Sequence, residues 1–112
     1  MIDSYSFGSI TIDGRKYTTD VIVYPDRVDA HWWRQEGHRL DPADLEEALR
    51  AQPEVLIVGT GCYGVMQVPP ETAEFVRQRG VEWVAARTGE AVRQYNALAA
   101  SRRVVAALHL TC

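Results

Sequence analysis

An apolar run that ends in closely spaced glycines sets the strongest limit on how this chain can fold. Residues 55–58 read Val-Leu-Ile-Val, and residues 59–64 follow as Gly-Thr-Gly-Cys-Tyr-Gly. A short run that is apolar at every position is typical of a strand buried on both faces of a sheet. Glycines directly after it allow backbone turns that other residues resist. The sequence therefore predicts a buried strand over 55–58 that leads into a tight glycine turn.

The spacing of Gly59, Gly61 and Gly64 is also that of a dinucleotide-binding fingerprint. In that motif a helix begins within the glycine turn, and its free N–H groups hold the pyrophosphate. Here residues 65–68 are β-like, and Pro69-Pro70 delays the next helix to about residue 70. We therefore expect no NAD, NADP or other cofactor. A tight turn or close backbone packing explains the glycines, and an anion-binding nest of N–H groups stays an alternative.

The rest of the chain predicts extended segments first and then alternating helices and strands. Extended segments are expected over residues 7–12, 17–24, 28–33, 65–68, 81–86 and 104–110, and helices over 41–52, 70–79 and from 88 to about 99. Asp13-Gly14 is typical of a hairpin turn, and Thr88 is expected to be an N-cap. Alternating helices and strands indicate a layered α/β domain, in which the early strands join a mixed sheet or form a small second sheet.

Length, charge and cysteine content exclude several classes of protein. A chain of 112 residues corresponds to one domain that can bury a core without disulfides. Its net charge of -3 offers no basic surface for nucleic acid. Two cysteines form no disulfide framework, which suits a reducing, cytoplasmic setting. The first residues carry no cationic or long apolar stretch, so we expect no targeting segment and no membrane insertion.

A few residue types could carry chemistry. Cys62 would need a neighbouring His or cation to become a nucleophile, and no such signature lies near it in sequence. His109 and Cys112 lie three positions apart in an expected strand, so they point to opposite faces, and we expect no metal site. We expect His109 to be a structural core residue that bonds to a backbone carbonyl, a hydroxyl or a water.

A dense group of aromatic and cationic residues lies before the first helix. Trp32-Trp33-Arg34 is followed by Gly37-His38-Arg39, and Trp and Arg are frequent anchors of protein interfaces. In the alternative, Trp33 packs inward and Trp32 covers the surface. The candidates for binding a ligand or partner are therefore Trp33, Arg34, His38, Gly59, Thr60, Gly61, Cys62, Tyr63 and Gly64.

Segments along nearly the whole chain resemble one known family. They are Phe7-Gly8 with Ile10, Ile12, Gly14, Tyr17 and Asp20; residues 33–34 and 37–40; residues 56–61; Thr88, Ala91 and residues 95–98; and residues 106–112. The chain thereby resembles domain of unknown function 498, the Mth domain, which includes the adipogenesis-associated Mth-domain protein and mitochondrial complex I assembly factor three. The resemblance implies a single three-layer α/β domain over residues 1–112, with a mixed central β-sheet, about three helices and an N-terminal antiparallel β-hairpin region.

The resemblance implies no established reaction, and its mitochondrial members suggest assembly or protein binding. We therefore expect a small cytoplasmic protein without catalysis that binds another protein; its biological role and oligomeric state stay open. The alternative is an enzyme that binds a small molecule or anion at the Gly59–Gly64 turn and uses Cys62. A His or Arg side chain within hydrogen-bond reach of an exposed Cys62 would favour the enzyme.

Overall fold

The buried run at residues 55–58 lies in a five-stranded mixed sheet with the order β5-β4-β8-β6-β7, and a separate antiparallel sheet has the order β1-β2-β3. The computed structural model describes all of residues 1–112. The strands are β1 Ile2–Ser6, β2 Ser9–Ile12, β3 Arg15–Tyr17, β4 Val21–Val23, β5 Val28–Asp29, β6 Val55–Thr60, β7 Glu82–Ala86 and β8 Val104–His109. The helices are a 3-10 turn Pro42–Leu45 (η1), α1 Glu46–Arg50, α2 Pro70–Gln78 and α3 Thr88–Leu98.

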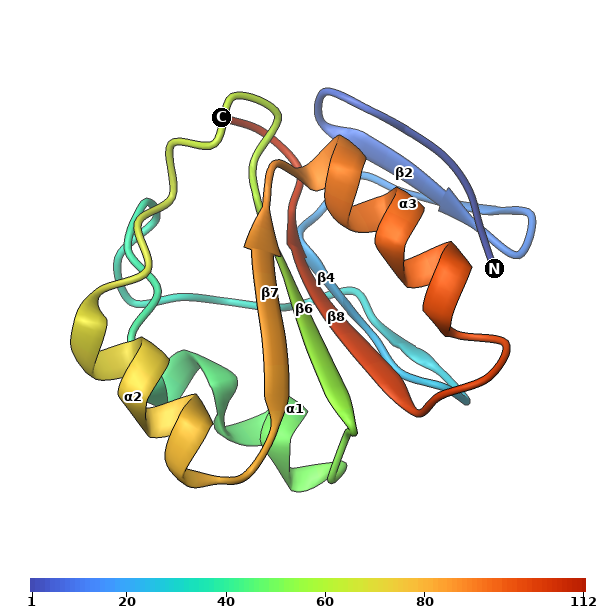
Figure 1. The fold of residues 1–112 in the computed structure, drawn as a ribbon. Helices are drawn as coiled ribbons and strands as arrows, with labels where there is room; N and C mark the ends of the chain where they lie inside the picture. Colours follow the sequence, from blue (N-terminus) through green and yellow to red (C-terminus); the bar gives the residue numbers. More distant parts are fainter.

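Helices and the small sheet cover the five-stranded sheet on both faces, which makes three layers (Figure 1). On one face, α1 and α2 pack over a core that contains Leu56 and Val105. On the other face, α3 and the small sheet pack over a core that contains Ile57 and Ala106. Successive residues of a strand point to opposite faces, so a continuous apolar run supplies both cores. The expected three-layer α/β class is confirmed, and the early strands take part in both sheets.

Strand β8 is central, as its composition predicts. It pairs antiparallel with β4 and parallel with β6. Val105 and Ala107 are fully buried. Because both faces of β8 are covered, any polar side chain at its end must find a partner inside the protein.

Several expected element boundaries are wrong. Residues 7–12 contain only β2, because Phe7-Gly8 forms the turn from a strand β1 that the sequence did not indicate. The segment 17–24 divides into β3 and β4, which belong to different sheets. Only Val28–Asp29 of segment 28–33 is a strand, and residues 65–68 form no strand. Short polar segments carry no local signal that distinguishes an edge strand from a loop.

The helix predictions are closer to the structure. Helix α2 begins at Pro70 and is followed by Gly80 with φ +72°, the left-handed end expected after a helix. The first helical segment begins as the 3-10 turn η1, with reciprocal capping between Asp41 and Asp44. Thr88 is the first residue of α3 and makes no N-cap hydrogen bond, so its expected cap role is wrong. No helix is both long enough and apolar enough to span a membrane.

Candidate functional site

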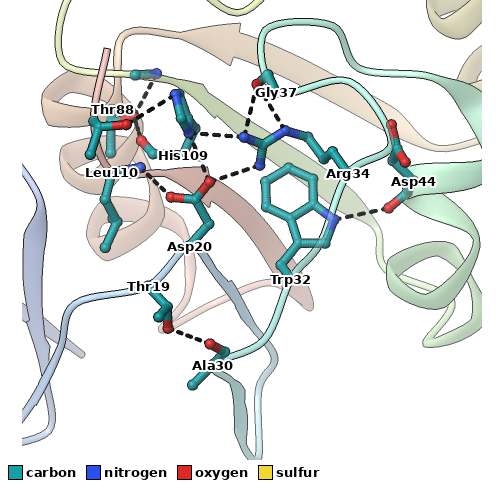
Figure 2. A network of polar contacts seen from close by, with 12 residues as sticks. Thr19, Asp20, Ala30, Trp32, Arg34, Gly37, Asp44, Thr88, His109 and Leu110 are labelled. Carbon is teal, nitrogen blue, oxygen red and sulfur yellow. Dashed lines mark hydrogen bonds and ion pairs between the residues drawn. The ribbon is translucent and has the colours of Figure 1, made fainter.

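A polar cluster of Asp20, Arg34 and His109 lies at the carboxyl end of β8 (Figure 2). Asp20 Oδ2 lies 2.8 Å from His109 Nδ1 and 2.9 Å from Arg34 Nη1. Asp20 Oδ1 accepts a hydrogen bond of 2.8 Å from the backbone N–H of Leu110. We call these three side chains the Asp20 cluster.

Strand pairing brings Asp20 and His109 together. Val21, the first residue of β4, lies opposite Leu108 of β8. One further step along each antiparallel strand places Asp20 beside His109. His109 falls on the face of the sheet that carries Trp32, because it continues the alternation of Val105 and Ala107. The pair is thus a consequence of register between segments at opposite ends of the chain.

Arg34 enters the cluster from the loop before η1. Its Nη2 donates to the carbonyl of Gly37 at 2.9 Å and lies 3.0 Å from His109 Nδ1. The ionised Asp20 can only accept, so we assign the Nδ1 proton of His109 to the shorter bond with Asp20; with that proton in place, Nδ1 cannot also accept from Arg34. Arg34 Nη1 makes an ion pair with Asp20 but no well-directed hydrogen bond. Its guanidinium also stacks over the Trp32 ring, 4.7 Å from the centroid.

The electrostatic balance of the cluster favours an ionised Asp20. Burial alone would raise the pKa of Asp20, but the hydrogen bonds from His109 and Leu110 and the charge of Arg34 together lower this pKa below its ordinary value. The Arg34 side chain is only 5% exposed. A buried guanidinium of this kind needs a carboxylate partner. The main structural role of the cluster is therefore a buried ion pair between Asp20 and Arg34, which joins the segment before β4, the loop before η1 and the end of β8.

Thr88 links this cluster to the glycine turn (Figure 2). Its hydroxyl donates to the carbonyl of His109 at 2.6 Å and accepts from the N–H of Gly61 at 2.9 Å. The N–H of Thr88 donates back to the carbonyl of Gly61. One fully buried hydroxyl thus joins the ends of β6 and β8 to the first residue of α3. The N–H of Gly61 is therefore bonded to Thr88 and is not free to contribute to an anion-binding nest.

Two glycines of the turn are required by close packing. A Cβ at Gly59 would lie 2.8 Å from the Thr88 hydroxyl oxygen. Gly61 has φ +106°, and a Cβ there would overlap the carbonyl group of Cys112. The structure thus favours close backbone packing as the reason for these glycines. The turn is followed by a loop, and α2 begins at Pro70 as predicted, so the helix of a dinucleotide site is absent from the turn; the absence of NAD binding itself stays a prediction.

The other candidates of the turn lie at the surface. Cys62 is partly exposed, and no hydrogen bond joins its thiol to a His or Arg side chain. Burial, with the nearby Cys62 thiol, raises the pKa of Tyr5, whose hydroxyl donates to the carbonyl of Leu110. Thr60 donates to the carbonyl of Ala86. Tyr63 is 63% exposed, and its ring lies 5.9 Å from that of Phe7.

The structure separates the two tryptophans that the sequence placed side by side. Trp32 is buried and donates its indole N–H to the carbonyl of Asp44, whereas Trp33 is 76% exposed. The alternative in which Trp33 packs inward is therefore wrong. His38 is exposed, although its ring centroid lies 6.0 Å from that of His109.

Sequence reasoning identified His109 as a core residue, which is confirmed, and one of its expected partner types is present, because the Thr111 hydroxyl lies 3.5 Å from His109 Nε2. Its shorter contact, at 2.8 Å, is with the carboxylate of Asp20, which the sequence did not indicate as a partner. Thr88 was also missed, because it was assigned to helix capping. The sequence does show Asp20 as a polar residue directly before the apolar strand β4. This position points to His109 only when the pairing of β4 with β8 is known. No group of three or more His, Cys, Asp or Glu side chains is arranged to hold a metal ion.

Comparisons with known proteins give a consistent family. A family model described as "Protein of unknown function (DUF498/DUF598)" matches residues 2–109. A conserved hypothetical protein of Pyrococcus horikoshii is similar in structure, with a TM-score of 0.85 and 32% identity over 100% of this chain and 99% of that one. A Mth938-like domain of Bordetella pertussis has a TM-score of 0.69 and 27% identity, over 98% of this chain and 85% of that one.

Among curated proteins, the chain is similar to NADH dehydrogenase [ubiquinone] 1 alpha subcomplex assembly factor 3 of Xenopus tropicalis. The two are 30% identical over 109 residues, which cover 95% of this chain. The match spans 58% of the length of the Xenopus protein. The similarity therefore covers only part of a longer relative.

Proposed function

The chain belongs to the DUF498/DUF598 family, and on that premise we propose that it is a non-catalytic module that binds another protein in the manner of an assembly factor. We propose a cytoplasmic location and a protein partner. The distant Xenopus relative is a complex I assembly factor by name. Because one fold supports many functions, this relation supports the class of activity and leaves the partner open.

The observation that carries the proposal is an exposed apolar patch beside the glycine turn. Phe7 and Tyr63 are 52% and 63% exposed and contact each other across two loops, and Val65 is 40% exposed. We call these three side chains the Phe7 patch. Aromatic residues are enriched in protein interfaces, where burial of apolar area stabilises a complex. The loops that carry the patch are held in place by the C-terminal segment, because the carbonyls of Leu110 and Cys112 accept from Gly8 and Val65.

The enzymatic alternative has weaker support. Asp20 could orient His109 as in a catalytic acid–base pair. The hydroxyl near His109 Nε2 is that of Thr111, and its distance of 3.5 Å is longer than the hydrogen bond by which a base activates a nucleophile. Cys62 has no His or Arg hydrogen-bond partner. The polar groups of the cluster instead satisfy one another, as expected for a structural network.

The proposal is tested by affinity purification from the source organism, with tagged protein at its native level. We expect the wild type to capture one defined protein, identified by mass spectrometry, and to bind it again when both are purified. The double substitution Phe7→Ser/Tyr63→Ser should weaken the purified complex at least tenfold. The control Gln78→Ser/Gln94→Ser keeps the net charge and changes helices α2 and α3 instead. Equal binding by both double variants, or no partner that binds after purification, would contradict the proposal.

A further inference from the structure

A surface cavity borders the Asp20 cluster through Trp32, whose ring lies under the Arg34 guanidinium. Its volume is about 470 Å³, and it opens between the segment that follows β4 and the helical segment η1–α1. Both tryptophans of the pair contribute to its lining, together with polar residues at its rim. None of the Phe7 patch residues and none of the Asp20 cluster residues line it. We call it the Trp33 groove.

The rim of the Trp33 groove is strongly acidic. Four carboxylates and one guanidinium line it: Asp29, Asp44, Glu46, Glu47 and Arg50. Arg50 is already paired with Glu47 at 2.9 Å. Asp29 Oδ1 accepts from the N–H of His31, and Asp44 Oδ2 accepts from the N–H of Asp41, so the second oxygen of each carboxylate has no partner. The groove therefore presents free acceptors and excess negative charge to solvent.

Trp33 supplies an aromatic face without a cation. Arginine side chains lie over four other rings of the protein, which are those of Tyr17, Tyr24, Trp32 and Phe75. Trp33 has no such partner, although it is the most exposed of the large hydrophobic side chains. Trp gives the strongest attraction for a cation placed over its ring. Carboxylates near this ring would hold such a cation from its other side.

We propose that the Trp33 groove binds an arginine side chain in a basic segment of a partner protein. This inference rests on the proposed protein-binding function but uses a second surface. A guanidinium is planar, so it can stack on Trp33 while its edge donates to the free oxygens of Asp29 and Asp44. A compact ammonium lacks the plane for stacking. Seven of the eleven lining residues are polar or charged, whereas pockets for small molecules are lined predominantly by hydrophobic side chains, which favours a charged side chain of a polypeptide.

The test uses acetyl-tetraarginine-amide as the probe and follows the indole N–H signal of Trp33 by NMR at 150 mM salt. We expect a saturable shift with a Kd below 1 mM, which corresponds to about -4 kcal/mol. Acetyl-tetracitrulline-amide keeps the shape of the probe without its charge and should bind at least tenfold more weakly. Tetramethylammonium chloride tests for a small-cation site. No saturable shift with tetraarginine, or equally tight binding of either comparison compound, would overturn the proposal.

Variants separate this groove from the general attraction of an acidic protein for a basic peptide. Trp33→Ala should weaken tetraarginine binding at least tenfold with an unchanged melting temperature, because the ring is mostly exposed. Asp29→Asn/Glu46→Gln should also weaken it. The control Glu71→Gln/Glu82→Gln makes the same change in charge at α2 and β7, where each acid pairs with one arginine, as Glu46 does with Arg79. An equal effect of the two acidic pairs would refute the groove, whereas partner capture through the Phe7 patch would remain a separate result.

Discussion

Asp20 makes three polar contacts with its two carboxylate oxygens. Oδ1 holds the N–H of Leu110, and Oδ2 contacts His109 and Arg34. Its backbone carbonyl also accepts from the N–H of Trp32. In an interior of low dielectric, a carboxylate of this kind balances the charge of the largely buried Arg34 guanidinium. The residue thus joins the end of β8 to the loop that carries both tryptophans.

Replacing Asp20 by Asn should destabilise the protein by about 3 kcal/mol. The amide has the same size, but it leaves the buried Arg34 charge without a counterion. Urea unfolding of both proteins at pH 7 measures the difference. The control is Asp26→Asn, since Asp26 forms an exposed ion pair with Arg27 and should cost less than about 0.5 kcal/mol. An Asp20→Asn protein as stable as the control would show that the cluster contributes little.

The same carboxyl should make the protein sensitive to acid. Its pKa in the fold is lower than in the unfolded chain, where an aspartate has a value of about 3.9. The unfolded chain therefore binds the proton more readily, so the stabilisation is complete above that value and is lost as the pH falls through the folded pKa. Unfolding free energies measured from pH 6 to pH 3 should fall more steeply for the wild type than for Asp20→Asn. Parallel curves would contradict this assignment.

At the scale of elements, the junction of β6, β8 and α3 depends on close backbone contact. Gly59 and Gly61 bring the end of β6 against Thr88 and the C-terminal residue Cys112. The hydroxyl of Thr88 then satisfies backbone groups of both strands. A buried junction of this kind has no space for an added methyl group.

Gly61→Ala should destabilise the protein by about 1–3 kcal/mol. Alanine is strained at φ +106°, and its methyl group would overlap the carbonyl group of Cys112. Gly89→Ala is the control, because Gly89 lies in α3 with nothing within 4 Å of an added Cβ. The control should be neutral or slightly stabilising, since alanine is the better helix former. Thermal unfolding of the two variants makes the comparison, and equal melting temperatures would refute the packing role of Gly61.

The small sheet is attached to α3 through Asn96. Its side chain accepts from the N–H of Ile2 at 3.0 Å and donates to the carbonyl of Ile2 at 2.8 Å. Asn96→Ala should therefore cost about 1–2 kcal/mol, because both backbone groups of Ile2 lose their partner. Amide exchange should also accelerate at Ile2 relative to Ile57 of β6. Unchanged exchange at Ile2 would show that apolar packing alone holds β1.

At the scale of the whole molecule, two apolar cores share one sheet. Strands β6 and β8 contribute to both cores, whereas β1, β2 and β3 contribute to one. Opening of the small sheet exposes one core, but separation of β6 from β8 exposes both. The resistance of the fold to opening should therefore differ between its two sheets.

Native-state hydrogen exchange tests this difference. We expect the amides of Leu56, Ile57 and Ala106, within β6 and β8, to exchange only through global unfolding. Amides of β2 and β3 should exchange faster, through local opening of the small sheet. Equal protection of the two sheets over a range of urea concentrations would show that they open as one unit.

Continuous apolar segments could be identified from sequence because their burial needs no knowledge of neighbours. Residues 55–58 and 104–110 must be covered on both faces wherever they lie, so β6 and β8 were expected as buried strands. Proline and glycine likewise bounded α2 locally. The short, polar β1 and β3 were missed or misplaced, since their pairing depends on segments elsewhere in the chain.

The site depended on pairing over a long distance in sequence. Asp20 and His109 are 89 positions apart, and only the antiparallel register of β4 with β8 places their side chains together. Similarly, nothing in the sequence distinguishes Trp32 from its neighbour Trp33. In the structure Trp32 is buried, because it stacks with Arg34 and donates to the carbonyl of Asp44, whereas Trp33 is exposed to solvent. Local residue patterns indicate how much of a segment must be buried. The partner of each polar side chain depends on strand register and loop packing, which only the assembled fold determines.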